Sequence, residues 1–172
     1  HLDIEELDKL YVIDPLCNIY NRNGFIRESD PLFKAAMQNG HKIMIAFIDM
    51  DGLKMINDNY GHKEGDFAIQ KLASIISECC MENCICARFG GDEFIFFGYD
   101  VDEEEGEEIK NRIIQKIADI NKIIYKPYEI SASMGFYIGT ASEDMTLFKM
   151  ITKADEIMYE QKKRKKMKRI RN

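Results

Sequence analysis

Two apolar stretches joined by a short glycine-rich turn constrain the fold of this chain more than any other feature. Cys84–Phe89 and Phe94–Tyr99 have the length and composition of β-strands, and Gly90-Gly91-Asp92-Glu93 connects them. Strands with so short a connection pair as an antiparallel hairpin. The sequence therefore predicts a β-hairpin whose turn carries two adjacent carboxylates.

Strand-like and helical patterns alternate around this hairpin. Lys42–Ile48 is a nearly continuous apolar run, typical of a buried central strand, and it ends in the acidic segment Asp49–Gly52. The other expected elements are a helix after Asn23-Gly24 that ends at Asn39-Gly40, a helix capped by Asp66 that reaches Cys79, a helix over 109–124, a strand over Tyr128–Ile138 and a last helix from Leu147 into the basic C-terminal tail. The β-α-β-β-α-β order predicts an α+β, ferredoxin-like fold with a central, mostly antiparallel sheet covered by helices.

Length and composition predict one ordinary domain. The chain has 172 residues with 24 basic and 30 acidic side chains, and 45% of its residues are apolar. No apolar run approaches the roughly 18 residues of a membrane span, and no signal-peptide pattern opens the chain. We therefore expect a cytoplasmic domain, and membrane attachment of a longer protein stays open. His1 in place of Met indicates a piece of such a protein, and the amphipathic stretch Leu2–Leu10 is expected to be the end of an upstream linker or stalk helix over 1–13.

The five cysteines are interpreted as reduced thiols, because the number is odd and nothing marks the chain for secretion. A zinc site is the alternative. The spacing from Cys79 to Cys86 lacks the usual C-x2-C pairs, and no histidine lies nearby.

Two acidic points suggest a metal site. Asp49 and Asp51 follow the buried strand, Asp92 and Glu93 lie on the hairpin turn, and the two points converge if the three strands are neighbours. Clustered carboxylates repel one another unless a cation is present, and hard oxygen ligands suit Mg²⁺ together with substrate phosphates. Adjacent glycines would let a phosphate approach the backbone closely. The alternative is an exposed hairpin in which these residues serve the turn alone.

A second polar group follows within 17 residues of Asp49 and could recognise a purine base. It contains Asn57-Asp58, Gly61-His62 and Gly65-Asp66. An Asp can accept from ring N–H and amino groups while an Asn donates to a carbonyl, a combination that favours guanine. The alternative is a helix cap and a turn with a structural His62. No P-loop and no Rossmann glycine motif is present.

Over nearly its whole length the chain resembles the GGDEF domain of bacterial diguanylate cyclases. The signature stretch is Arg88–Phe94. Four further blocks match in the same order: Asp14–Leu16 with Tyr20–Arg22, Asp49–Asp58, Gly61–Asp66, and Ala154-Asp155 with Met158-Tyr159 and Lys162.

The resemblance implies a palm-like fold related to adenylyl cyclases and polymerases, with the domain over 14–172. It further implies condensation of two GTP into cyclic di-GMP and pyrophosphate by a two-fold pair of domains, with Mg²⁺, or Mn²⁺ as the alternative ion. Asp49, Glu93 and the Met50 carbonyl would bind the metal, and Asp92 would ligate it or act as general base on the ribose 3′-hydroxyl. The residues implied to bind substrate are Leu53, Lys54, Asn57, His62, Asp66, Lys162 and Lys166. The implied partners are GTP, a second copy of the domain and an upstream sensory domain.

Three departures from the family pattern affect these expectations. Gly52 and Leu53 stand where the family often has aromatic residues, and Lys166 stands where it usually has arginine, which alone offers a bidentate fork. The Arg-x-x-Asp of the family's product-inhibition site is replaced by Met81 and Cys84, so inhibition through that site is not expected. A catalytically silent GTP-binding module remains the alternative to an active cyclase. Asp66 argues against a mixed-base cyclase.

The basic tail bears on the choice of partner. Its density of Lys and Arg would by itself suggest nucleic acid or membrane. Because Lys162 and Lys166 have a triphosphate as the better partner under the resemblance, no nucleic-acid partner is expected.

Overall fold

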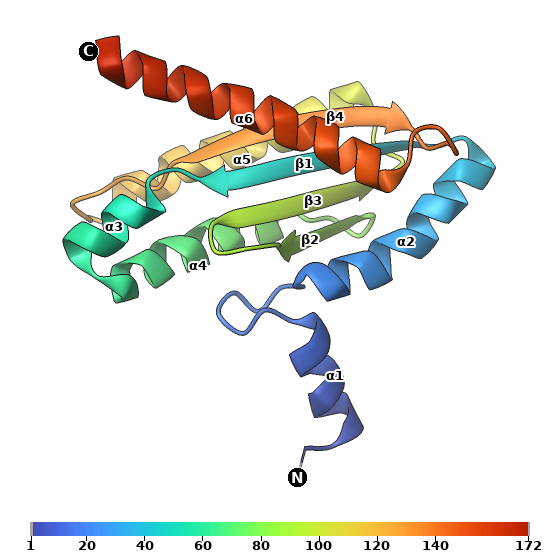
Figure 1. Cartoon of the computed structure of the whole chain (residues 1–172), viewed down its shortest axis with the longest axis horizontal. Helices are drawn as coiled ribbons and strands as arrows, with labels where there is room; N and C mark the ends of the chain where they lie inside the picture. The colour runs from blue at the N-terminus through green and yellow to red at the C-terminus, as the bar shows by residue number, and fades with distance from the viewer. Residues whose placement is uncertain (1, 172) are drawn as a thin grey trace.

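A four-stranded antiparallel sheet forms the centre of the molecule (Figure 1). The computed structural model describes residues 2–171, with side chains to residue 170. The strands are β1 (Lys42–Met50), β2 (Cys84–Arg88), β3 (Glu93–Tyr99) and β4 (Ala132–Thr140), in the spatial order β2-β3-β1-β4. This order and the β-α-β-β-α-β connectivity confirm the predicted α+β, ferredoxin-like fold.

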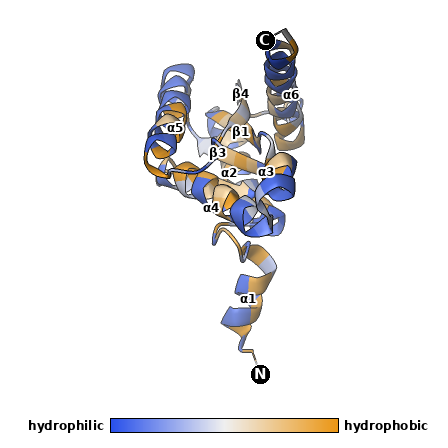
Figure 2. Cartoon of the chain, turned by 90° about the vertical axis from the view of Figure 1, so that its left-hand side faces the viewer, coloured by the Kyte–Doolittle hydropathy of each residue, from blue (hydrophilic) through white to orange (hydrophobic). Residues whose placement is uncertain are grey.

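Helices cover both faces of the sheet. Their bounds are α1 (Ile4–Val12), α2 (Arg22–Asn39), α3 (Leu53–Tyr60), α4 (His62–Glu78), α5 (Glu103–Ile123) and α6 (Leu147–Arg171). The side view of Figure 2 shows α5 and α6 on opposite sides of the sheet. None of the described helices combines the length and the apolar character that crossing a membrane requires.

The central strand β1 contributes to two hydrophobic cores, because successive side chains point to opposite faces. Ile43, Ile45 and Phe47 pack with side chains of α2 and α6. Met44, Ala46 and Ile48 pack with α4 and α5 on the other face. A strand buried on both faces explains the continuous apolar run in the sequence, and it fixes the position of Asp49 at the strand's end.

The start of α2 and the presence of α3 differ from what the sequence predicted. Asn23-Gly24 does not precede α2 but lies in its first turn, because Asn21 caps the helix by accepting the Gly24 N–H at 3.0 Å. A Cβ at Gly24 would overlap the Val12 carbonyl, so this glycine serves close packing against α1. The pattern did not predict α3.

Asp66 is not the N-cap of α4, and that prediction was wrong. The helix begins at His62 after Gly61, whose φ of 93° turns the chain between α3 and α4. Asp66 therefore lies one turn inside the helix. The prediction failed because a glycine with positive φ, rather than a polar cap, ends one helix and begins the next.

The last strand begins at Ala132 and not at Tyr128, because helices hold the preceding residues. The Ile130 N–H donates to the Asn121 side chain of α5 at 2.8 Å. The Tyr128 hydroxyl donates to the Glu64 carboxylate of α4 at 2.5 Å. These side-chain bonds replace ladder bonds over 128–130.

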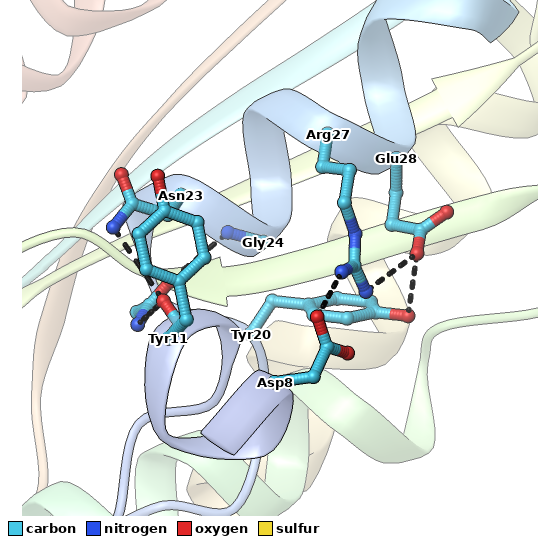
Figure 3. A network of polar contacts seen from close by, with 8 residues as sticks. Asp8, Tyr11, Tyr20, Asn23, Gly24, Arg27 and Glu28 are labelled. Atoms are coloured by element: carbon cyan, nitrogen blue, oxygen red, sulfur yellow. Dashed lines mark hydrogen bonds and ion pairs between the residues drawn. The ribbon is translucent and has the colours of Figure 1, made fainter. Parts of the chain in front are cut away.

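Helix α1 projects from the body of the molecule and contacts α2 through polar side chains (Figure 3). Arg27 bonds to Asp8 at 2.9 Å, and the side chain of Asn23 donates to the Tyr11 carbonyl. The five cysteines are free thiols, as predicted. Among the described residues no group of three or more His, Cys, Asp and Glu side chains is arranged to hold a metal by itself.

Candidate active site

Three acidic residues, Asp49, Asp92 and Glu93, lie near one another where β1 ends beside the hairpin turn. Asp49 and Glu93 are direct partners in the antiparallel register of β1 and β3. The Met50 N–H donates to the Asp92 carbonyl at 2.8 Å, which extends the pairing into the turn. The convergence expected from the sequence is thus present, because the hairpin and the central strand are neighbours.

Asp49 is the most constrained of these acids. Its carboxylate is 12% exposed, and its Oδ2 forms an ion pair with Lys162 Nζ at 2.9 Å. Oδ1 is buried and has no hydrogen-bond partner among the described residues. Burial, assisted by the nearby charge of Asp92 and opposed by Lys162, raises the pKa of Asp49 from 3.8 to about 6.

This chemistry fits a divalent cation. A buried carboxylate oxygen without a donor is unfavourable unless a ligand satisfies it. The two neighbouring acids, Asp92 and Glu93, are half-buried and open to solvent. Since these side chains alone do not form a complete cation site, backbone carbonyl and substrate oxygens would have to complete the coordination, as Mg²⁺ commonly requires.

Arg88 holds the signature turn in place. Its guanidinium donates to the carbonyls of Gly90 and Gly91 at 2.8–3.2 Å, and to Asp14 at 3.3 Å. Both partners of the Arg88–Asp14 ion pair are less than one-fifth exposed. Arg88 therefore links the segment that follows α1 to the turn that carries the acids.

The two glycines of the turn are not required by the fold. Neither has a positive φ. A Cβ at Gly91 would meet nothing within 4 Å, and at Gly90 it would meet only Glu93 at ordinary contact distance. The space next to them opens into a pocket of about 390 Å³ that Arg88 and Phe89 also line. The glycines thus leave room on the outside of the turn, where a ligand could approach.

Helix α6 brings a face of basic side chains to the same end of β1. Lys162 contacts Asp49, as described above, and Lys165 Nζ lies 2.7 Å from Asp51 Oδ2. A pocket of about 160 Å³ follows along the helix. It is lined by Asp51, Gly52, Lys162, Lys165, Lys166 and Arg169.

The N-terminus of α3 faces this pocket at Gly52. Gly52 is its N-cap, with φ 70°, and no side chain caps the helix. The first N–H groups of a helix are unpaired within it and attract anions. Leu53 is the half-buried first residue of α3 and packs on the core, while Lys54 is exposed.

The expected base-recognition residues lie on α3 and α4, outside the basic pocket. Asn57 Oδ1 lies against Gly65, where a Cβ would overlap it, so the glycine brings Asn57 next to the backbone that carries Asp66. Asp66 and His62 are both exposed. The packing of α3 on α4 thus brings Asn57 and Asp66 together, while the His62 side chain forms no hydrogen bond or ion pair with the residues that the structure describes.

Three features of the site were missed in the sequence. Asp51 accepts from Ser131 and Ser133 at 2.7 Å each, in addition to Lys165. Lys165 and Arg169 join Lys162 and Lys166 on one helix face. The spacing of three, four and seven residues along α6 was the available signal, but the dense run of basic residues hid it.

Comparison with known proteins agrees with this geometry. The family model described as "Diguanylate cyclase, GGDEF domain" matches residues 11–168. The probable diguanylate cyclase DgcJ of Escherichia coli K12 is 32% identical over 90% of this chain and 30% of its own length. Diguanylate cyclase DgcP of the same organism is 31% identical over 88% of the chain and 45% of its length. The chain thus spans less than half of either relative.

Solved structures of GGDEF domains share the fold. The coiled coil and GGDEF domain of DgcB from Caulobacter crescentus, in complex with c-di-GMP, superposes with a TM-score of 0.83 at 24% identity, covering 93% of this chain and 85% of that one. The GGDEF domain of TpbB (YfiN) from Pseudomonas aeruginosa gives 0.79 at 26% identity, with 88% and 89% covered. Because the family model matches nearly the whole chain, the protein described here belongs to the GGDEF domain family.

Proposed function

We propose that two copies of this domain, related by a two-fold axis, condense two GTP into cyclic di-GMP and release pyrophosphate. The observation that carries the proposal is the meeting of Asp49, Asp92 and Glu93, with one buried and unpaired Asp49 oxygen. Such a cluster is unfavourable alone and becomes favourable once a cation is bound. The named cyclases among the relatives support the same reaction.

The acids would bind the metal in this proposal, and one of them would also accept a proton. Asp49, Glu93 and the Met50 carbonyl would hold Mg²⁺ or Mn²⁺, with Asp92 as a further ligand. The bound ion would offset charge on the transferring phosphate. Asp92, which is half-buried on the turn, would also accept the proton of the ribose 3′-hydroxyl as that oxygen attacks the α-phosphate of the other nucleotide.

The remaining residues would bind the nucleotide. Lys162 would exchange Asp49 for a phosphate oxygen, and Lys166 and the N–H groups of Leu53 and Lys54 would surround the triphosphate. Asn57 and Asp66 would read guanine, with His62 supporting the loop near the base and ribose.

Catalysis requires a partner copy, because one domain holds one GTP and the attack crosses between two. The exposed apolar side chains of α1, including Ile4 and Leu10 at 86% and 65% exposed, fit a paired stalk. The DgcB structure likewise joins a coiled coil to a GGDEF domain. We assign residues 1–13 to such a stalk, which would follow an upstream sensory domain. We assign residues 14–172 to a catalytic domain in the cytoplasm, where GTP is available.

Product inhibition through the family's usual site is not part of this proposal. Met81 is 57% exposed and Cys84 is half-buried, and neither side chain can form the charged contacts of arginine and aspartate.

A silent GTP-binding module is the second candidate. The observation in its favour is that Lys162 occupies one oxygen of Asp49 while Gly52 leaves the loop over the phosphates without an aromatic side chain. Such a module would bind GTP and form no product.

The test is turnover by a chain fused to a dimeric coiled coil, with GTP and Mg²⁺. We expect cyclic di-GMP, and Glu93→Gln should lower the rate by roughly a hundredfold or more because it weakens the metal site. The matched control is Glu107→Gln, an exposed acid of α5 that should leave the rate unchanged. Tight GTP binding without product would support the silent module, and full activity of Glu93→Gln would refute the role of that carboxylate.

A further inference from the structure

The basic face of α6 carries four positive side chains, and only two of them are paired with an acidic side chain among the described residues. Lys162, Lys165, Lys166 and Arg169 all line the pocket of about 160 Å³ beside Gly52. Lys162 is paired with Asp49 and Lys165 with Asp51. Among the described residues, Lys166 and Arg169 form no ion pair and no side-chain hydrogen bond. Two uncompensated cations in one pocket indicate an anionic ligand with more than one charged oxygen.

Arg169 lies at the junction of two pockets. It also lines a second pocket, of about 230 Å³, which shares Asp51 and Gly52 with the first and extends towards Tyr60 and Tyr128. Arg169 therefore lines the space next to the loop at the N-terminus of α3.

The basic residues follow one another along α6 with increasing distance from the acids. Lys162 marks the end of the pocket at the catalytic acids. Arg169 lies seven residues further, which is about 10 Å along the helix axis. In Figure 1, α6 runs in the same direction as β1, and its C-terminal end projects beyond the sheet on the side where α3 lies. A triphosphate whose reacting phosphate lies near Asp49 and Glu93 would point its far end along this face.

We propose that Arg169 binds the terminal phosphates of the nucleoside triphosphate, and so supplies the bidentate contact that Lys166 cannot make. The planar fork of an arginine matches two phosphate oxygens, whereas a lysine acts as a point charge. This proposal rests on the proposed binding of GTP and extends it to a residue near the end of α6.

The test compares four proteins with two ligands at one ionic strength. Wild type, Arg169→Ala, Arg169→Lys and Arg164→Ala are titrated with a non-hydrolysable GTP analogue and with GMP, each with Mg²⁺, by calorimetry or chemical-shift changes. Arg164 is the matched control, because it is an exposed arginine of the same helix that lines neither pocket.

Arg169→Ala should weaken binding of the triphosphate analogue by roughly tenfold to a hundredfold, the range of a lost hydrogen bond to a charged group. Arg169→Lys should recover only part of the loss, and the affinity for GMP should not change. Equal affinities of Arg169→Ala and Arg164→Ala for the analogue, or an equal loss for GMP, would overturn the role of Arg169 alone. Wild type that fails to bind the analogue would overturn this proposal together with the proposed function.

Discussion

At the scale of single residues, Asp49 shows the conflict between the stability of the empty protein and the binding of a cation. Its carboxylate is buried, half unsatisfied, and has its pKa raised to about 6. The ionised form is therefore less favourable in the folded protein than in the unfolded one. This cost is complete above pH 6 and disappears below the unfolded pKa near 3.8.

Asp49→Asn should therefore stabilise the metal-free protein. At pH 8 we expect a gain of about 1–3 kcal/mol in the free energy of unfolding, a range taken from the energy of a pKa shift of this size. The gain should shrink as the pH falls from 7 to 4, because wild-type Asp49 becomes protonated. Urea unfolding with a chelator, with Asp58→Asn as an exposed control, measures it. A variant less stable than wild type at pH 8 would contradict the account.

The sequence predicted the acids at this scale but not their basic partners. Asp49, Asp92 and Glu93 could be placed together because strand ends and a hairpin turn have defined positions. Lys165 and Arg169 could not, because the register of a basic run on a helix depends on where that helix packs. The sequence grouped Asp51 with Asp49 and did not predict its contacts with Ser131 and Ser133, because these serines are about 80 residues away along the chain.

At the scale of elements, the side chain of Asp51 connects α6 to the residues at the start of β4 through hydrogen bonds and an ion pair. Its carboxylate accepts from Ser131, Ser133 and Lys165, and Lys165 also donates to the Ala132 carbonyl at 2.6 Å. Burial alone would raise the pKa of Asp51, but Lys165 and the two serines outweigh it and hold the pKa below its usual range. The contact fixes the rotation of α6 that brings Lys162 onto Asp49.

Asp51→Asn should destabilise the protein by about 2–4 kcal/mol at pH 7, because it leaves Lys165 without its charged partner. The contribution of Asp51 is present above its unfolded pKa and is lost as the pH falls through the lower folded pKa, so the difference from wild type should shrink below about pH 4. Chemical unfolding and hydrogen exchange of α6 measure both effects. Glu160→Gln, an exposed acid of α6, is the control. Unchanged exchange in α6 would show that Asp51 does not hold the helix.

Elements that depend on local patterns were predicted best. The central strand and the hairpin followed from their apolar runs. The starts of α4 and β4, and the whole of α3, depended on contacts between segments: Gly61 at a left-handed turn, and the bonds from Tyr128 to Glu64 and from Ile130 to Asn121. A pattern read along the chain does not contain such contacts.

At the scale of the whole molecule, the proposed function makes this site one half of a reaction centre that two copies of the domain would complete. The acids, the basic face of α6 and the N-terminus of α3 lie at one end of the central strand β1. Helix α1, whose apolar side chains are exposed, projects from the body of the molecule (Figure 2). The Arg88–Asp14 ion pair joins the segment after α1 to the signature turn. The orientation of a paired α1 would thus bear on how two turns face each other.

The most direct measurement is the rate of cyclic di-GMP formation per chain, at rising chain concentration, for the isolated chain and for the chain fused to a dimeric coiled coil. The account predicts that the rate per isolated chain rises with concentration, that the fused chain is active at every concentration, and that two pyrophosphates accompany each cyclic product. A rate per chain that is independent of concentration and of fusion would contradict the paired site. GTP left intact by the fused chain, while a known cyclase turns over in parallel, would contradict the proposed reaction itself.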